Sequence, residues 1–194
     1  MLLAFPISVI QLWAFWALGL IFFLFLIRAY ANRKSENGVR YDGRSRTGIV
    51  LQGLAMGLAA FGPVRPSLGR FSAVGLLGSV AVILLMSGAI ALFATSSREL
   101  GRNWSVVARM RSDHELIRTG PYARVRHPIY LGLLLFLLAF VIAYGHWLQL
   151  VVAMPLYLAG TTIRTRVEDG LLERKFGDTF RDYRRSTPAL IPRL

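Results

Sequence analysis

Four long stretches without Lys, Arg, Asp or Glu restrict how this chain can fold. They run over residues 2–27, 49–64, 71–94 and 130–163. A helix that crosses a bilayer needs about 20 apolar residues, so each of the first three stretches is a candidate crossing, the second being short. The fourth stretch is too long for one crossing by a helix that rises about 1.5 Å per residue. Because Tyr144-Gly145-His146-Trp147 interrupts it, we predict a tight helical hairpin there and an all-α integral membrane protein with about five transmembrane helices.

The first two stretches raise separate questions. A cleaved signal peptide places basic residues before a shorter apolar core, whereas here the basic residues begin at Arg28, after the stretch. We therefore predict a retained helix over residues 2–27. The second stretch contains Gly53 and Gly57 in a G-x-x-x-G pattern. This pattern lets helices approach closely, and two interpretations are open: a helix contact, or small residues that only fill space.

The charge of the chain is explained mainly by its orientation in a membrane. Lys and Arg number 23 against 10 Asp and Glu, a net charge of +13, while 55% of the residues are hydrophobic. With five crossings, all the basic residues except Arg65 and Arg70 fall on one side. Basic residues favour the cytoplasmic side, so we expect a multi-pass protein with its polar loops in the cytoplasm. The expected partner is the lipid bilayer, and not nucleic acid.

The chain contains no cysteine. This excludes disulfides, cysteine-ligated zinc and thiol nucleophiles, and we expect no metal site. The chemistry must therefore come from other polar residues. Two polar stretches that flank the hairpin, from Arg98 to Tyr130 and from Arg164 to Pro192, carry more specific residues than a connection requires. A short turn between the hairpin helices would bring both stretches together into one site.

In the first polar stretch, Gly120-Pro121 indicates a turn. Pro128 can occupy the first turn of the next helix, where its missing N–H costs nothing. The free N–H groups and the positive dipole end beside His127 would then suit an anionic group. Taken alone, His127 also fits a structural or interfacial histidine, and Arg126 also fits an anchor at the cytoplasmic membrane surface.

In the second polar stretch, Arg164, Glu168 and Leu172 share one helix face. Ionisable side chains at the inner end of a crossing are candidates for function, and a solvated pair at a helix end is the alternative. We expect the chain to continue as a C-terminal cytoplasmic amphipathic helix, weakened at Gly177. Its apolar residues are Val167, Leu171, Leu172, Phe176, Phe180 and Tyr183.

Taken in order, these motifs resemble the isoprenylcysteine carboxyl methyltransferase family, within the wider group that includes the membrane phospholipid methyltransferases. The resemblance covers residues 100–194, about half of the chain, and Asp169 stands where relatives often have Glu. The matching elements are Leu100-Gly101, Asn103-Trp104-Ser105, Gly120-Pro121-Tyr122, Arg126-His127-Pro128-Ile129-Tyr130-Leu131-Gly132, Arg164, Glu168-Asp169, Leu172, Phe176-Gly177 and Ile191-Pro192.

The resemblance implies a methyltransferase that uses S-adenosyl-L-methionine and a lipophilic methyl acceptor, with its cofactor pocket on the cytoplasmic side. Residues 1–95 would form three N-terminal crossings. Residues 96–194 would form the catalytic region: the cofactor loop, the hairpin of residues 130–163 and a C-terminal cytoplasmic cap. Arg164 and Glu168 match the family's arginine and glutamate near the reaction centre. The implied cofactor-binding residues are His114, Tyr122, Arg126, His127, Pro128, Tyr130 and Gly132.

The acceptor most consistent with these residues is a carboxylate. A carboxylate needs no strong base, so Arg164 would hold it through two parallel hydrogen bonds, while Glu168 orients Arg164 or binds the ammonium of the cofactor. With an amine or thiol acceptor, Glu168 would act as the base. A helix N-terminus also suits the carboxylate of the cofactor, and tyrosine rings can face its sulfonium charge.

Several alternatives stay open at this point. The same fold would serve a phospholipid N-methyltransferase or a thiol S-methyltransferase. A membrane reductase that uses NADPH shares a similar C-terminal architecture, although the Arg-His-Pro-x-Tyr-x-Gly string favours the methyltransferase. A scaffold or transporter-like protein would spread its charges evenly over the cytoplasmic face and would bury no cluster of His, Arg and Glu. No feature of the sequence specifies an oligomeric state.

Overall fold

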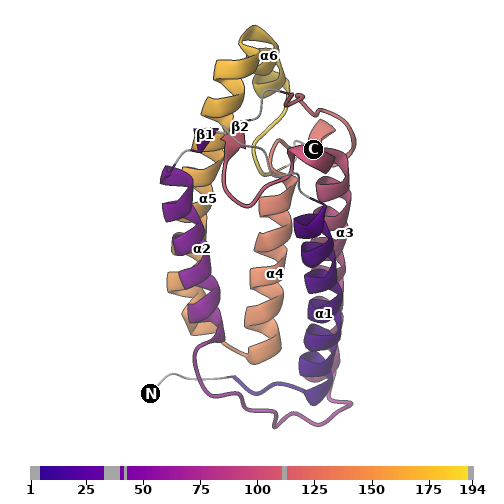
Figure 1. Ribbon diagram of the computed structural model, residues 1–194. Helices are drawn as coiled ribbons and strands as arrows, with labels where there is room; N and C mark the ends of the chain where they lie inside the picture. Colours follow the sequence, from indigo (N-terminus) through magenta and orange to yellow (C-terminus); the bar gives the residue numbers. More distant parts are fainter. Residues whose placement is uncertain (1–4, 33–39, 42, 111–112, 192–194) are drawn as a thin grey trace.

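The computed structural model describes residues 5–32, 40–41, 43–110 and 113–191. Within these residues the chain forms five long helices that run in alternating directions, followed by one short helix (Figure 1). The helices are α1 (Val9–Ala31), α2 (Arg44–Ala60), α3 (Ala73–Leu100), α4 (Pro128–Tyr144), α5 (Trp147–Phe176) and α6 (Asp178–Ser186).

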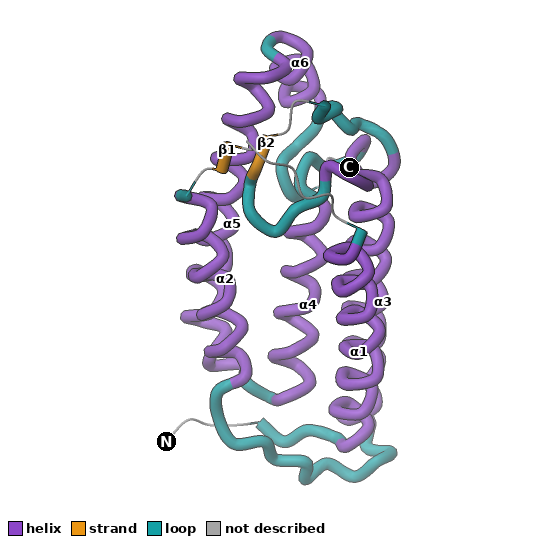
Figure 2. The backbone as a smooth tube through the Cα atoms, viewed as in Figure 1, coloured by secondary structure: helices purple, strands orange, loops and turns teal. Residues whose placement is uncertain are grey.

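Short elements complete the end of the bundle that carries α6 (Figure 2). Two single-turn 3-10 helices, η1 (Gly101–Asn103) and η2 (Gly120–Ala123), lie in the connection between α3 and α4. Two-residue strands, β1 (Arg40–Tyr41) and β2 (Arg109–Met110), pair antiparallel with Arg40 opposite Met110. This pairing attaches the connection before α2 to the connection between α3 and α4.

Local sequence signals fix the helix ends. Ser8 caps α1 in a capping box with Gln11, and Ser72 caps α3 through the backbone N–H of Gly75. Pro128 opens α4 at its first position, as predicted. Gly145 ends α4 in the left-handed conformation at φ 70°, where a Cβ would clash with the carbonyl of Phe5. The predicted hairpin of α4 and α5 is therefore confirmed.

The C-terminal segment differs from the expectation. α5 continues well past the apolar stretch to Phe176, and Gly177, at φ 53°, then breaks the helix before α6. The segment that we expected as one amphipathic helix is thus divided between the end of α5 and a separate α6. Phe180 and Tyr183 on α6 are buried. The sequence signal was the glycine, whose conformational freedom here changes the chain direction instead of only weakening a helix.

Within the part of the chain that the structure describes, two segments are long and apolar enough to cross a membrane: α1, and the segment from Ala73 to Asn103. α4 is apolar but shorter, and α2 is equally short. Large apolar side chains cover the outside of the bundle, among them Trp13, Leu77 and Val151, each 71% exposed. An exposed apolar surface of this kind fits membrane association. Residues 2–4 of the first predicted crossing lie outside the described residues, and residues 5–8 precede the helix.

The helices pack in two groups joined by α4. α5 packs mainly on α2, while α4 packs mainly on α3, which also contacts α1. The Gly53 and Gly57 pair has open space around it among the described residues, so of its two open interpretations the helix contact is not observed there. The close approach occurs instead between Gly48 on α2 and Gly160 on α5, where a Cβ on Gly48 would lie 2.7 Å from the carbonyl oxygen of Gly160.

The end of the bundle opposite α6 is closed by backbone contacts. The N-terminal segment donates from the Phe5 N–H to the Gly145 carbonyl, and from the Ile7 N–H to the Arg65 carbonyl, both at 3.0 Å. His146, at the start of α5, is fully buried. Its Nδ1 lies 2.8 Å from the carbonyl oxygen of Ala59, and its Nε2 lies 3.2 Å from that of Pro63. One histidine thus links the α4–α5 turn to the α2–α3 connection.

Candidate functional site

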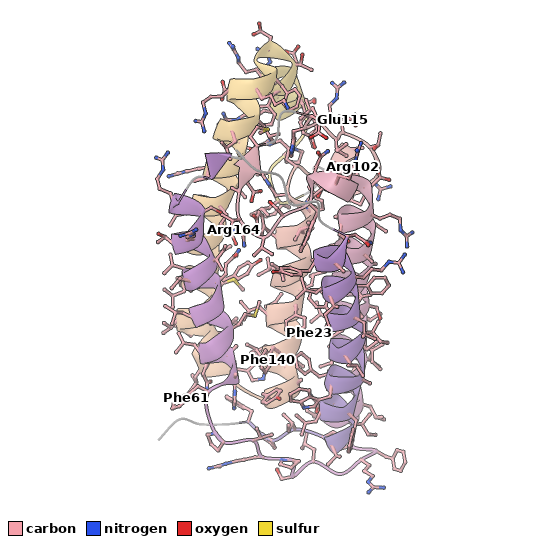
Figure 3. All side chains as sticks on the ribbon, viewed as in Figure 1. Phe23, Phe61, Arg102, Glu115, Phe140 and Arg164 are labelled. Atoms are coloured by element: carbon pink, nitrogen blue, oxygen red, sulfur yellow. The ribbon has the colours of Figure 1, made fainter. Side chains whose placement is uncertain are left out.

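A cavity of about 330 Å³ lies at the end of the bundle that carries α6. Part of its wall is polar and contains seven of the predicted site residues. The rest is apolar and comes from α1, α3, α4, α5 and the α3–α4 connection, with Phe22, Phe93 and Leu133 as examples. Glu115 also lines the cavity and lies at this end of the bundle, far from Phe61 (Figure 3). The predicted residues in the wall are His114, Tyr122, Arg126, His127, Tyr130, Arg164 and Glu168.

His127 precedes Pro128 at the start of α4 and is 5% exposed. Both of its ring nitrogens face carboxylates on α5. Nε2 lies 3.0 Å from Oδ1 of Asp169, and Nδ1 lies 3.4 Å from Oε2 of Glu168. Two neighbouring residues of α5 therefore hold the ring from both sides. Of the two interpretations of His127, this arrangement favours a component of a charged site.

Arg126 is held by Asp169 and by the C-terminal segment. Its Nη2 donates to Oδ2 of Asp169 at 3.0 Å, and its Nη1 donates to the carbonyls of Arg184 and Thr187. The backbone N–H groups of Arg126 and His127 donate to the carbonyls of Pro188 and Ala189. The segment after α6 thus closes over the start of α4. Pro192 of the closing Ile191-Pro192 motif lies outside the described residues.

Tyrosines complete the polar wall. The Tyr130 hydroxyl donates to Oε1 of Glu168. The Tyr157 hydroxyl donates to the Tyr130 carbonyl at 2.6 Å, and the Tyr183 hydroxyl donates to the Tyr122 carbonyl at the same distance. Tyr122 is 6% exposed. These bonds fix the first turn of α4 and the loop before it against α5 and α6.

Arg164 lies on α5 where this helix meets α2 (Figure 3). Its Nη1 donates to Oε1 of Gln52 at 3.0 Å, and its Nη2 donates to the carbonyl of Val106 at 2.6 Å. The guanidinium carbon sits 4.9 Å from the centre of the Tyr130 ring. Among the described residues, no carboxylate lies within ion-pair distance of Arg164, although the residue is only 8% exposed. Glu168 is paired with His127 and Tyr130 instead.

The ion pairs among Arg126, His127, Glu168 and Asp169 set the charge state of this group of residues, the charged cluster. Burial alone would lower the pKa of His127, but Asp169 and Glu168 outweigh burial and raise that pKa above its ordinary value. Burial alone would raise the pKa of Glu168, but pairing with His127 lowers it, and Arg164 adds to the effect. The pKa of Asp169 is lowered against burial by His127 and Arg126. Near neutral pH the cluster therefore contains two carboxylates and a histidine that favours its charged form.

Both buried tyrosines outside the crossings stay neutral. Burial, followed by the charge of Glu168, raises the pKa of Tyr122 well above its usual range. Burial raises the pKa of Tyr183 to about 12. These hydroxyls therefore serve as hydrogen-bonding groups and not as anions at physiological pH.

Two predicted residues lie apart from the cavity wall. Pro128 is fully buried at the start of α4. Gly132 faces α3, where a Cβ would lie 3.3 Å from the carbonyl oxygen of Ala89. Their places indicate that they shape the first turns of α4 and its packing on α3. Within the described residues, no group of three or more His, Asp and Glu side chains could hold a metal ion.

The structure adds two polar residues that the sequence reasoning missed. Asp169 was noted only as a departure from a family pattern, yet it binds both Arg126 and His127. Gln52 lies in the short second apolar stretch, where a single amide gave no reason to connect it with Arg164. The available signal was a polar side chain inside an apolar segment, since such groups are buried only with partners.

Taken together, these features describe an all-helical protein with apolar helices suited to a membrane and a charged, partly apolar cavity at one end. The family model described as phospholipid methyltransferase matches residues 77–179, just over half of the chain. The chain therefore belongs to the phospholipid methyltransferase family. This membership confirms the methyltransferase resemblance drawn from the motifs.

Two curated relatives match part of the chain. The protein-S-isoprenylcysteine O-methyltransferase of Schizosaccharomyces pombe is 29% identical over 96 residues, which cover 48% of this chain and 41% of the relative. The nickel-cobalt-cadmium resistance protein NccN of Alcaligenes xylosoxydans xylosoxydans is 32% identical over 107 residues, which cover 54% of this chain and 49% of the relative. The chain thus spans somewhat less than half the length of each relative that it matches.

Proposed function

We propose that this protein is an integral membrane methyltransferase that uses S-adenosyl-L-methionine and methylates the carboxylate of a lipophilic acceptor. The observation that carries the choice of acceptor is the state of Arg164. Its guanidinium is buried, and its hydrogen-bond partners, Gln52 and the Val106 carbonyl, are uncharged. Buried charges in proteins are normally paired. A carboxylate from a substrate would supply the missing anion beside the apolar wall of the cavity.

The proposed membrane arrangement has α1 to α5 as five crossings, with the cavity on the cytoplasmic side. It is supported by the alternation of the helices and by the position of the basic connections. Because the chain has no cysteine, single-cysteine variants can report sidedness without background. A membrane-impermeant maleimide on intact cells should label Ser67→Cys but not Arg118→Cys. Labelling of Arg118→Cys and not of Ser67→Cys would show that the protein has the opposite orientation in the membrane.

The residues present fit a cofactor that carries a carboxylate, an ammonium and an adenine. Arg126 keeps a buried Nε–H without a hydrogen-bond partner among the described residues. This N–H would donate to the carboxylate of the cofactor. Glu168 would hold the ammonium, while Tyr122 and Tyr130 offer ring faces. His127 and Asp169 would keep Arg126 and Glu168 in place through the pairs described above. When bound, S-adenosyl-L-methionine supplies an electrophilic methyl group next to sulfur.

In this proposal the protein acts mainly by alignment. Methyl transfer is a direct displacement, so the acceptor oxygen must lie in line with the methyl carbon and the sulfur. Of the five N–H donors of Arg164, two are used by Gln52 and Val106, which leaves three for the acceptor carboxylate. Phe22, Leu26 and Leu133 would surround its hydrocarbon part and exclude water.

A scaffold function is disfavoured by the same geometry. That alternative predicts no buried cluster of His, Arg and Glu. Instead, Glu168 lies 3.4 Å from His127, and Arg164 is buried. The family match also lends no support to a reductase.

The deciding experiment is a methyl-transfer screen with purified protein in lipid nanodiscs and methyl-labelled S-adenosyl-L-methionine. The acceptors are a prenylcysteine, a long-chain fatty acid, a small thiol and a phospholipid amine. We expect base-labile label, the mark of an ester, on one of the two acids. Label only on the thiol or the amine would overturn the carboxylate assignment and favour the thiol or phospholipid alternative.

A binding comparison tests the cofactor independently of the acceptor. Isothermal titration should show binding of S-adenosylhomocysteine and none of NADPH. Binding of NADPH without binding of S-adenosylhomocysteine would overturn the proposed activity in favour of a reductase.

A further inference from the structure

Gln52 makes two buried side-chain hydrogen bonds from α2 to α5. Its Oε1 accepts from Nη1 of Arg164 at 3.0 Å, and its Nε2 donates to Oγ1 of Thr161 at 2.8 Å. The three side chains are 6%, 8% and 0% exposed in the order Gln52, Arg164 and Thr161. The two bonds also fix the amide orientation, because exchanging its oxygen and nitrogen would turn an NH₂ group toward the guanidinium.

The distance between Gln52 and Arg164 is set by the crossing of the two helices. Gly48 lies one turn before Gln52 on α2, and Gly160 lies one turn before Arg164 on α5. A Cβ on Gly160 would lie 2.7 Å from the carbonyl oxygen of Gly48, so the backbones touch at this level. A Cβ on Gly48 would also overlap the stem of the Arg164 side chain. The glycine crossing therefore brings Gln52 within reach of the guanidinium.

The second partner of Arg164 also depends on α2. The Val106 carbonyl belongs to the loop between α3 and α4, and the neighbouring Ala108 N–H donates to Oγ of Ser45 at 3.2 Å. Ser45 is fully buried in the first turn of α2. The pairing of β1 with β2 holds the same loop to the segment just before α2. Both hydrogen bonds of Arg164 are thus supported from α2.

We infer that Gln52 is a positioning residue that fixes the Arg164 guanidinium for an anionic acceptor without placing a negative charge against it. The inference rests on the proposed function. A carboxylate at this position would orient Arg164 equally well, but it would also neutralise the charge that the acceptor needs. A neutral amide gives the orientation without the neutralisation. Gln52 lies outside residues 77–179, so the N-terminal half supplies part of the reaction centre.

The test compares three variants with the wild type. Gln52→Met keeps the length of the side chain but removes both hydrogen bonds. Gln52→Glu keeps an acceptor for Arg164 and adds a negative charge. Gln149→Met is the matched control. Gln149 lies on α5, is buried like Gln52, and donates to the Phe61 carbonyl at the opposite end of the bundle. The probes are the acid that the wild type methylates in the screen, and S-adenosylhomocysteine for binding.

We expect Gln52→Met to lower kcat/KM for the acid by about 10-fold to 100-fold, the range that corresponds to one hydrogen bond to a charged group. Gln52→Glu should raise the KM for the acid further than Gln52→Met does. Affinity for S-adenosylhomocysteine should stay within about twofold of the wild type in all variants, and Gln149→Met should keep wild-type kinetics.

Three outcomes would contradict these expectations in different ways. Wild-type kinetics in Gln52→Met and Gln52→Glu would overturn the inference and leave the proposed function standing. Equal losses in Gln149→Met and the Gln52 variants would also overturn it, because the effect would then be one of general packing. A wild-type protein that methylates no acid would overturn the carboxylate proposal, and the inference would fall with it.

Discussion

His127 and His146 occupy similar places at opposite ends of the bundle, yet their partners differ in kind. Each residue immediately precedes a helix, α4 or α5, and each is buried. The ring of His127 lies between two carboxylates, whereas that of His146 lies between two backbone carbonyls. The two carboxylates around His127 favour the charged form of its ring. The two carbonyls around His146 come from separate parts of the chain, so this ring connects them. Burial alone therefore does not distinguish a site histidine from a structural one.

The largest effect that follows from this comparison concerns Glu168. Glu168→Gln removes the negative charge that faces His127 and receives the Tyr130 hydroxyl bond, and leaves a neutral amide with one acceptor oxygen. We expect kcat to fall by about 100-fold, the loss expected when a bound reactant is displaced by about 1 Å from its aligned position, while the melting temperature changes little. The measurement is the methyl-transfer rate at saturating substrates. Full activity in folded Glu168→Gln would remove Glu168 from the reaction centre.

His127→Ala should produce the next largest effect. Without the ring, Glu168 and Asp169 lose the cation between them, and Arg126 keeps only part of its support. We expect affinity for S-adenosylhomocysteine to fall by about 10-fold or more, as for loss of a hydrogen bond to a charged group. Titration calorimetry in nanodiscs measures it. Equal affinity in the wild type and the variant would show that the cluster does not support cofactor binding.

His146→Ala is the matched substitution at the other end. It leaves the carbonyls of Ala59 and Pro63 without their buried partner, which should cost about 1–3 kcal/mol of unfolding free energy. Affinity for S-adenosylhomocysteine below the melting temperature should be unchanged. Thermal unfolding in one detergent, followed beside the binding titration, separates the two quantities. If His146→Ala lost as much affinity for S-adenosylhomocysteine as His127→Ala, the distinction between a structural histidine and a site histidine would be wrong.

The smallest effect is a dependence of stability on pH at the charged end. Because the folded pKa of His127 is raised, its protonation stabilises the fold fully below the unfolded value of about 6.5 and loses this effect as pH rises through the folded pKa. The melting-temperature difference between the wild type and His127→Gln should therefore shrink as the pH rises above about 6.5. A difference that grows over this range would contradict the pairing.

The sequence predicted the architecture well wherever the signals were local. Charge-free stretches marked the helices, Gly145 marked the hairpin, and Pro128 marked the start of α4. The polar residues around the hairpin converge on one cavity because the antiparallel pair places both of its flanks at the same end. These conclusions needed only helix geometry and the counting of charges.

The remaining features depend on contacts between distant segments. The crossing of α2 and α5 uses Gly48 and Gly160 and not the Gly53 and Gly57 motif, because the relevant spacing lies across two helices. Gln52 meets Arg164 across 112 positions of sequence. The carbonyls of Pro188 and Ala189 close over α4 through backbone groups, which no side-chain pattern encodes. The sequence predicts only a weakened helix at Gly177, whereas in the structure α5 ends there and α6 begins in a new direction.

The uncharged hydrogen-bond partners of Arg164 have a consequence for turnover. An acid that reaches the guanidinium brings one negative charge, whereas its methyl ester brings none. For the proposed acceptor, the attraction that draws the substrate in is therefore cancelled by the reaction itself. The ester keeps an uncharged carbonyl acceptor, which binds the guanidinium more weakly than a carboxylate does, and its apolar contacts, which the surrounding lipid can replace at little cost. Release of the product into the bilayer would then require no conformational change of the protein.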